Sequence, residues 1–185
     1  MMAMNECSGK TAAIGIFFDA EKAYDMCPHE GIISSLATTY NMPPFLLQII
    51  RSFLSNRKQI VRVEDSFSSL RNVKSGVPQG SILASLLFIA YTAPVQRISF
   101  SNGASTVAYA DDLCYLRAIR EENRQIDIEE IESDINKIKG VITDLKMKLN
   151  VDKTKVVVFS VAPIPPEIPI LYLDGEAIEE LSTHK

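Results

Sequence analysis

The stretch that decides the fold reads TVAYADDLCYL over residues 106–116. Two apolar, β-prone segments, 106–110 and 113–116, flank the adjacent aspartates Asp111 and Asp112, a pattern that predicts a strand, a tight turn and a return strand. Adjacent carboxylates repel one another, so they contribute to a fold only where a counter-charge is present. A bound cation is one such counter-charge. An ordinary polar hairpin tip is the alternative, because Asp is a favoured turn residue.

A third aspartate ends another apolar strand. Residues 14–18 read IGIFF and stop at Asp19, which is typical of a buried central strand. Two strand ends can therefore present Asp19, Asp111 and Asp112 along one sheet edge. Hard divalent ions prefer oxygen ligands, and two of them about 3.5–4 Å apart can activate an attacking hydroxyl and stabilise a leaving oxygen in phosphoryl transfer. The spacing leaves open that Asp19 caps the helix that follows.

The rest of the chain alternates between predicted helices and strands without a regular βαβ repeat. Apolar residues at helical spacing predict helices at 29–40, 45–54, 82–97 and 121–149. β-prone segments predict a hairpin within 59–73, a strand at 155–160 and a final hairpin opening at 171–175. The spacing in 121–149 also fits a coiled coil, but its length favours a helix packed on a sheet. This order predicts the α+β class.

Composition describes an ordinary globular protein. The 185 residues are 46% hydrophobic and 23% charged, and the net charge of -4 does not by itself favour nucleic-acid binding. Three cysteines without CxxC spacing indicate neither a disulfide framework nor a zinc site, which fits a reducing intracellular compartment. The apolar run 82–95 is shorter than the roughly 20 residues of a membrane-spanning helix.

Four segments, in order, resemble the palm motifs of reverse transcriptases, the RNA-directed DNA polymerases. They read FDAEKAYD at 18–25, GVPQGSIL at 76–83, YADD at 109–112 and LNVDKTK at 149–155. The ending KAYD of the first and the form GxPQGSxL of the second resemble non-LTR (LINE-type) retrotransposon enzymes more closely than retroviral or group II intron enzymes. The resemblance covers residues 14–159.

This resemblance implies an α+β, polymerase palm-like fold, with an antiparallel sheet packed on helices and partial fingers. Residues 1–185 are expected to form a single palm domain that lacks the N-terminal fingers and the C-terminal thumb. The implied reaction adds dNTPs to a primer 3′-hydroxyl with two Mg²⁺ or Mn²⁺ ions. The implied partners are an RNA template, a DNA primer and dNTPs, without a membrane, in the nucleus or cytoplasm. The sequence does not determine the oligomeric state.

The same resemblance implies the catalytic roles. Asp19 and Asp111 match metal ligands, with Asp112 completing the metal site. Lys153 matches the lysine of the fourth motif, which is proposed to protonate departing pyrophosphate. The alternative for Lys153 is an exposed lysine at a strand edge.

Substrate contacts follow in the same way. Tyr24 matches an aromatic residue under the sugar of the incoming nucleotide, where the ring can exclude a 2′-hydroxyl; a tyrosine that only packs is the alternative. The other expected substrate-binding residues are Ala20, Glu21, Lys22, Ala23, Gln79, Gly80 and Tyr109. Phosphate contacts are expected from the basic residues Arg57, Lys58 and Arg62.

Two alternatives come from other classes. A catalytically inactive remnant with the palm fold would act only as a binding or scaffold module. A palm-like nucleotidyl cyclase would share the sheet and the two-metal site, but it has no use for Tyr24 or for the Pro78-Gln79-Gly80 loop.

Overall fold

The computed structural model describes residues 11–100, 103–160 and 167–181. The chain divides into two compact units. Unit 1 contains Met1–Glu21, Pro94–Asp144 and Lys148–Lys185, and unit 2 contains Lys22–Ala93 and Leu145–Met147. Pro94 lies inside a helix at one of these boundaries. Proline removes a backbone hydrogen bond there, which weakens the helix where the units divide.

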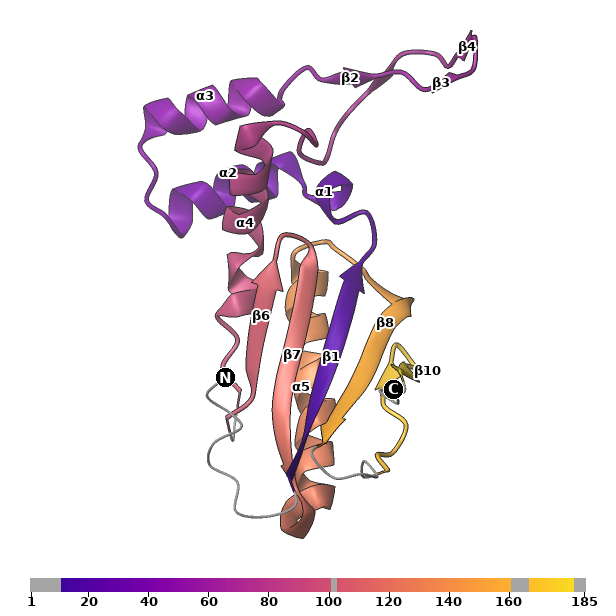
Figure 1. Ribbon diagram of the computed structural model, residues 1–185. Helices are drawn as coiled ribbons and strands as arrows, with labels where there is room; N and C mark the ends of the chain where they lie inside the picture. Colours follow the sequence, from indigo (N-terminus) through magenta and orange to yellow (C-terminus); the bar gives the residue numbers. More distant parts are fainter. Residues whose placement is uncertain (1–10, 101–102, 161–166, 182–185) are drawn as a thin grey trace. The chain divides into compact units, whose positions relative to one another are not determined.

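Unit 1 is built on a five-stranded sheet in the order β11-β8-β1-β7-β6 (Figure 1). The strands are β1 (Thr11–Ala20), β6 (Ser105–Tyr109), β7 (Asp112–Arg120), β8 (Leu149–Ser160) and β11 (Glu179–Leu181). The central strand β1 pairs antiparallel with both β7 and β8, and β11 pairs parallel with β8. A short hairpin, β9 (Tyr172–Leu173) and β10 (Glu176–Ala177), confirms the predicted turn at 174–175.

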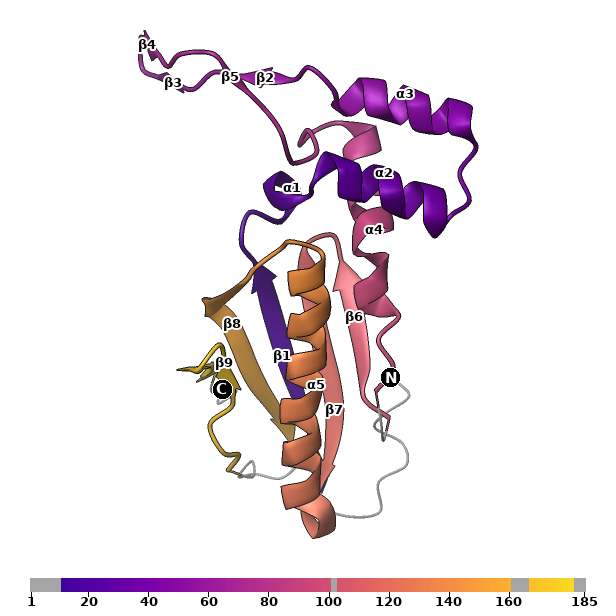
Figure 2. The same cartoon turned by 180° about the vertical axis from the view of Figure 1, so that it is seen from behind.

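One face of this sheet is covered by α5 (Arg124–Asp144), which follows the short 3-10 helix η1 (Glu121–Asn123) (Figure 2). Burial alternates along β7, as expected for a strand with one covered face. Five isoleucines of α5 recur every three or four residues and are buried, namely Ile128, Ile131, Ile135, Ile138 and Ile142, whereas Ile126 in the first turn is exposed. The helix is therefore packed on the sheet, as its length predicted.

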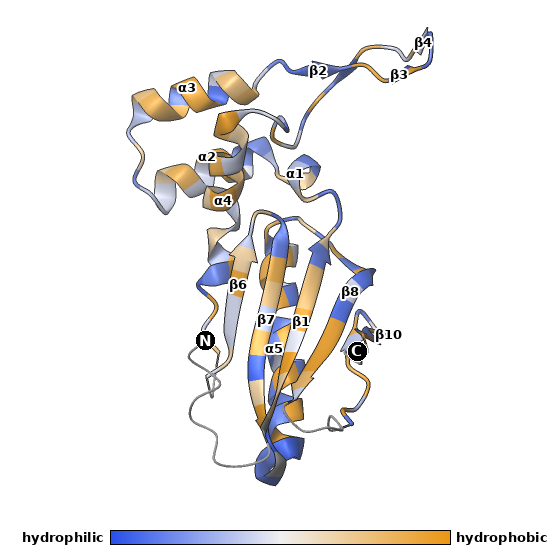
Figure 3. Ribbon diagram, in the orientation of Figure 1, coloured by the Kyte–Doolittle hydropathy of each residue, from blue (hydrophilic) through white to orange (hydrophobic). Residues whose placement is uncertain are grey.

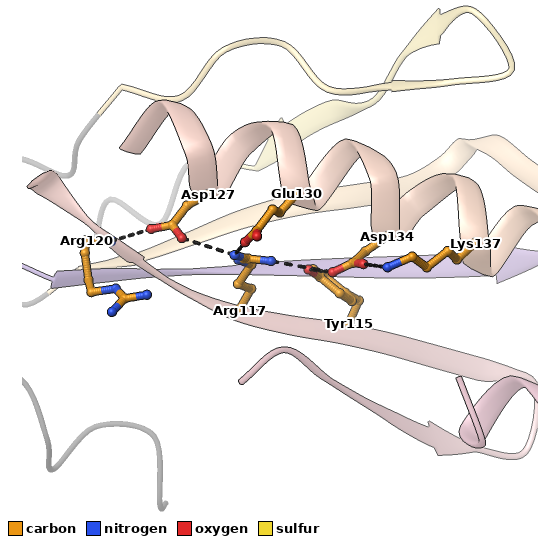
Figure 4. Close-up of polar contacts among 7 residues, drawn as sticks. All are labelled: Tyr115, Arg117, Arg120, Asp127, Glu130, Asp134 and Lys137. Carbon is orange, nitrogen blue, oxygen red and sulfur yellow. Dashed lines mark hydrogen bonds and ion pairs between the residues drawn. The ribbon is translucent and has the colours of Figure 1, made fainter. Parts of the chain in front are cut away.

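A buried charge cluster joins α5 to β7 (Figure 4). The side chain of Arg117 is fully buried and pairs with Asp127 at 3.1 Å, with Asp134 at 3.6 Å and with Glu130. The Tyr115 hydroxyl donates to Asp134 at 2.8 Å. Burial opposes the charge of Arg117, but its hydrogen bonds to Glu130, Tyr115 and Asp127 outweigh that effect and raise its pKa. The cluster therefore fixes which turn of α5 faces which residue of β7.

Unit 2 is mainly helical. It contains α1 (Ala23–Met26), α2 (His29–Thr38), α3 (Pro44–Leu54) and the part of α4 (Ile82–Gln96) up to Ala93. Between α3 and α4 the chain forms a two-part ribbon, in which β2 (Lys58–Gln59) pairs with β5 (Arg71–Asn72) and β3 (Arg62–Val63) pairs with β4 (Ser66–Phe67). This ribbon is the hairpin predicted within 59–73.

Two expected boundaries were wrong. The helix expected over 121–149 ends at Asp144, and β8 begins at Leu149 rather than at residue 155. The reason is tertiary: Leu149 pairs with Ala20 and Asn150 with Asp19, so the end of β1 extends β8 backwards. Lys146 turns the chain with a φ of 56°. The α+β class and the sheet packed on helices are confirmed. None of the helices in the described ranges has the length and apolar character needed to cross a membrane.

Candidate active site

Asp19 and Asp112 are neighbours across the sheet. In the antiparallel register of β1 and β7 the last pair is Phe18 with Leu113, and this register continued by one position aligns Asp19 with Asp112. Phe18 and Leu113 are buried on the α5 side, and the two aspartates therefore share the other face. Directly opposite residues have Cβ atoms about 5 Å apart. Hydrophilic residues occupy this end of β1 and β7 (Figure 3).

The row of residues extends to both sides of the aspartates. Tyr109 on β6 pairs with Asp112, and Asn150 on β8 pairs with Asp19. The Tyr109 side chain projects into solvent and is 82% exposed. Four neighbouring strands thus contribute one polar row at one edge of the sheet.

The backbone around Asp19 is held by β8. A register shift, or β-bulge, lies between Phe17 and Asp19. The amide of Asp19 donates to Thr154 Oγ1 at 3.4 Å, and the Thr154 hydroxyl donates to the Asn150 carbonyl at 2.7 Å. The residue that caps α1 is Lys22, without a side-chain capping bond. The alternative in which Asp19 caps that helix is therefore wrong.

Lys153 approaches the same carboxylate. Its Nζ lies 3.8 Å from Asp19 Oδ2, and both side chains are partly open to solvent. This is a surface ion pair, which contributes little to stability because water screens it. The position of Lys153 therefore matters for the charge at the sheet edge rather than for holding the fold together.

Asp111 lies in the tight turn between β6 and β7, and its neighbour Ala110 has a φ of 54°. A non-glycine residue in the left-handed region is strained, and such strain gathers at functional sites. Asp111 and Asp112 are exposed. Neither makes an ion pair or a side-chain hydrogen bond with another residue of the described ranges. Two adjacent carboxylates at this turn thus remain available to a cation.

The donor chemistry of this edge fits Mg²⁺ or Mn²⁺, because Asp19, Asp111 and Asp112 offer only carboxylate oxygens. Across residues 11–100, 103–160 and 167–181, however, no three His, Cys, Asp or Glu side chains are gathered closely enough to hold a metal ion. The three aspartates share a sheet edge without forming a closed group. Their role as metal ligands stays a prediction.

The end of β1 is engaged with the start of β8. The amide of Glu21 donates to the Lys148 carbonyl at 2.8 Å, and the Glu21 carboxylate pairs with Lys148 Nζ at 2.9 Å. This pairing raises the pKa of Lys148. The backbone amide of Glu21, a residue expected to bind substrate, therefore already has a protein partner. Ala20 ends the strand.

In unit 2, Tyr24 on α1 stacks on Phe88 of α4. The ring centroids are 4.4 Å apart and the ring planes differ by 10°. Phe88 is buried, and Tyr24 is only partly so. Lys22 precedes α1 with a left-handed backbone, and Ala23 is buried at the first helical position. Tyr24 is thus partly a packing residue, while one side of it stays open.

The loop that precedes α4 runs alongside α1. Gly76 N donates to the Cys27 carbonyl at 2.7 Å, and Val77 N donates to the Tyr24 carbonyl at 2.8 Å. Beyond these anchored residues, Gln79 and Gly80 are exposed, and Gly80 has a φ of 86°. The structure thereby places the second motif, 76–83, against the end of the first motif, 18–25.

The basic residues of the ribbon differ in their surroundings. Arg62 lies over the Phe67 ring at 5.5 Å and donates to the Glu64 carbonyl at 2.8 Å. Arg57 and Lys58 make no ion pair or side-chain hydrogen bond with the rest of the described chain. These two are therefore freer than Arg62 to contact a phosphate.

Sequence reasoning missed four residues that hold the candidate site residues in place: Asn150, Thr154, His29 and Phe88. Asn150 and Thr154 fall within the fourth motif, whereas His29 and Phe88 lie a few residues past the first and second motifs. The roles of all four depend on partners outside their own segment. The signal that could have found His29 is its polar ring at the first position of the helix that follows Tyr24.

Comparison with known proteins gives consistent matches. The family model described as reverse transcriptase (RNA-dependent DNA polymerase) matches residues 3–177. The chain is 33% identical over 106 residues to the probable RNA-directed DNA polymerase from transposon BS of Drosophila melanogaster, covering 55% of this chain and 12% of that protein. It is 30% identical over 120 residues to the polymerase from the mobile element jockey of the same species, covering 62% and 13%.

Solved structures show the same fold. Apo telomerase from Candida tropicalis, truncated from its C-terminal domain, matches with a TM-score of 0.60 and 15% identity, covering 83% of this chain and 32% of that one. Telomerase from the same organism, in complex with a fragment of telomeric RNA, matches with a TM-score of 0.58 and 12% identity, covering 83% and 27%. The predicted palm-like fold is thereby confirmed.

Proposed function

Because this chain belongs to the reverse transcriptase (RNA-dependent DNA polymerase) family, we propose that it forms the palm of an RNA-directed DNA polymerase of a non-LTR retrotransposon. The reaction adds dNTPs to a primer 3′-hydroxyl on an RNA template. The chain spans only 12% and 13% of the two curated relatives described above, so their activity is carried over as a proposal. The observation that supports it best is the register of β1 and β7, which continued by one position aligns Asp19 with Asp112 at one edge of a palm-like sheet.

In this proposal Asp19, Asp111 and Asp112 hold two Mg²⁺ or Mn²⁺ ions. Such ions, when bound, favour deprotonation of the attacking hydroxyl and stabilise the leaving pyrophosphate. The aspartates contribute carboxylate oxygens as ligands and take no part in proton transfer in this proposal. Their task is to fix positions. The Thr154 and Asn150 bonds that anchor the Asp19 backbone support that task.

Lys153 supplies a proton to departing pyrophosphate. Its Nζ lies 3.8 Å from the Asp19 carboxylate, so an ammonium group is present at the edge where the leaving group would form. The alternative of a merely exposed lysine is less well supported, because the side chain is directed at a candidate metal ligand.

Residues of unit 2 bind the nucleotide. The Tyr24 ring, fixed on one side by Phe88, would exclude a 2′-hydroxyl. Exposed Gln79 and Gly80 would contact the incoming nucleotide and the template base, with the Gln79 amide able to donate and accept. Further substrate contacts are proposed for Ala20, Glu21, Lys22, Ala23 and Tyr109; for Glu21 they exclude the backbone amide, which donates to Lys148.

The RNA template and the DNA primer would meet basic residues of the ribbon, Arg57, Lys58 and Arg62. The exposure of Lys58, and the lack of protein partners of Arg57 and Lys58 within the described chain, support phosphate contact. A nuclear or cytoplasmic location and a single palm domain over residues 1–185 are part of the same proposal.

The test is primer extension on an RNA template with Mg²⁺ or Mn²⁺, by this chain or a longer one that contains it. Asp111→Ala combined with Asp112→Ala should abolish extension, since two of the three proposed carboxylate ligands disappear. Asp144→Ala, at an exposed carboxylate that ends α5, is the matched control and should extend normally. Extension that survives the double substitution would rule the proposal out.

The alternative of an inactive palm remnant makes a different prediction. Calorimetry would then show no binding of Mg²⁺ or dNTP to the wild-type chain. Heat from Mg²⁺ binding that disappears in the Asp111→Ala, Asp112→Ala variant supports the enzyme instead.

A further inference from the structure

The loop before α4 lies directly against the backbone of α1. Gly76 has a φ of 88°, and a Cβ added there would lie 2.8 Å from Asp25 Cα and 2.9 Å from the Asp25 carbonyl oxygen. Real Cβ atoms do not approach backbone that closely, so glycine is required both for the conformation and for the contact. The loop and the segment that carries Tyr24 are therefore in direct backbone contact.

Hydrogen bonds join the two segments from one side. Gly76 N and Val77 N donate to the carbonyls of Cys27 and Tyr24 at 2.7 and 2.8 Å, and Ser75 forms a β-bridge with Pro28. These bonds use the backbone N–H groups of Gly76 and Val77. The carbonyl of Gly76 needs a donor from elsewhere, because the residue is buried and an unpaired buried carbonyl costs about 1–3 kcal/mol.

His29 provides that donor. Its Nε2 lies 2.9 Å from the Gly76 carbonyl oxygen. A carbonyl can only accept, so Nε2 carries the hydrogen in this contact. His29 is the first residue of α2, and the helix is anchored by the buried side chains Ile32, Ile33 and Leu36. The imidazole thus connects a firmly packed helix to the loop.

We propose that His29 is a positioning residue of the nucleotide-binding site. It holds the loop 75–80 against α1, so that exposed Gln79 and Gly80 keep a fixed arrangement with Tyr24, whose own carbonyl is bonded to the loop. This proposal rests on the proposed function, because that function assigns nucleotide binding to Tyr24, Gln79 and Gly80. The hydrogen bond itself is independent of it. His29 touches no substrate in this scheme and acts only through the loop.

The test compares two substitutions at His29. His29→Leu keeps side-chain bulk but removes the donor, whereas His29→Gln retains an N–H group that can reach the carbonyl. Ser35→Ala is the matched control, since it removes another side-chain donor of α2, the Ser35 hydroxyl bonded to the Ala90 carbonyl at 3.3 Å. The first readout is NMR hydrogen exchange of the Gly76 and Val77 amides, which needs no catalysis.

In His29→Leu these two amides should exchange about tenfold faster, as expected for the loss of a hydrogen bond at a buried carbonyl. The amides of Ile50 and Leu54 in α3 should be unchanged. His29→Gln and Ser35→Ala should match the wild type at the loop. The second readout is polymerase kinetics: the KM for dNTP should rise about five- to tenfold in His29→Leu with kcat within about twofold, and His29→Gln should restore it.

Wild-type exchange at the loop in His29→Leu would overturn the proposal, as would equally faster exchange throughout unit 2. A KM for dNTP that stays at the wild-type value in His29→Leu would also overturn it. Failure of the proposed function is seen separately, as absence of extension by the wild type. The Asp111→Ala, Asp112→Ala variant should lose extension while its loop amides exchange as in the wild type.

Discussion

The ring of Tyr24 lies flat on the ring of Phe88, with 4.4 Å between the centroids and 10° between the planes. Tyr24 belongs to a helix of only four residues. So short a helix has little stability of its own. Phe88 is 1% exposed in α4, so a well-packed helix supplies the rigidity that α1 lacks. The orientation of a tyrosine proposed to select the sugar thus depends on a residue 64 positions further along the chain.

Phe88→Leu should therefore reduce discrimination against ribonucleotides. Loss of an aromatic pair worth about 0.5–1.5 kcal/mol predicts a three- to tenfold fall in the ratio of kcat/KM for dNTP to that for the matching rNTP. Leu87→Ala is the control, because Leu87 is buried in the same helix but belongs to no ring pair with Tyr24. An unchanged ratio in Phe88→Leu, beside a large change in Tyr24→Ala, would show that the ring needs no support.

Gly76→Ala should be far more damaging than alanine at another glycine with positive φ. Gly175 has a φ of 82° and nothing within 4 Å of an added Cβ, so Gly175→Ala carries only the backbone cost of about 1–2 kcal/mol. Gly76→Ala adds a clash with the Asp25 backbone, typically a further 1–3 kcal/mol. Urea unfolding measures both losses. Equal losses in the two variants would mean that the loop is free to move away from α1.

Arg117→Leu should strongly destabilise unit 1. The substitution leaves Asp127 buried without its cation and Asp134 with only Lys137, 2.7 Å away, and breaking a buried ion pair in this way costs about 3–5 kcal/mol. Arg120→Leu is the matched control on the same strand. The Arg120 side chain is exposed, and only its backbone amide bonds to Asp127, so the expected loss is under about 0.5 kcal/mol. Chemical denaturation of the two variants measures both losses of stability. Similar midpoints would contradict the prediction.

The chain should lose stability in alkali partly through Cys27. Burial raises the pKa of the Cys27 thiol from 9.0 to about 12. Between these values the unfolded chain loses a proton that the folded chain keeps, so stability falls as pH rises, by up to about 1.4 kcal/mol per pH unit. From pH 8.5 to 10.5 that amounts to about 2 kcal/mol. Burial also raises the pKa of Tyr91, to about 12.

Cys27→Ala removes the first of these contributions. Its urea midpoint should therefore fall less between pH 8.5 and 10.5 than that of the wild type. The hydrogen bond from Cys27 Sγ to the Ala23 carbonyl is lost at both pH values and cancels in the comparison. An identical fall in both proteins would mean that the thiol ionises equally easily in the folded and unfolded chains.

Local pattern was enough to predict much of the fold. The alternation around Asp111 and Asp112 gave the β6–β7 hairpin, and the three-and-four spacing of isoleucines gave α5, because these periods are properties of the backbone itself. The start of β8 at Leu149 was missed. Pairing with Ala20, far earlier in the chain, decides it, and no local pattern encodes a strand partner.

The sequence by itself determined the family, the class of fold and the identity of the aspartates, because motifs and periodicity are read within short segments. Only the tertiary structure decided that Asp19 lies opposite Asp112, that Arg117 is buried among carboxylates and that His29 reaches the Gly76 carbonyl. The physical reason is that register, burial and hydrogen-bond partners arise between residues far apart in the chain. Their free energies depend on how separate segments pack.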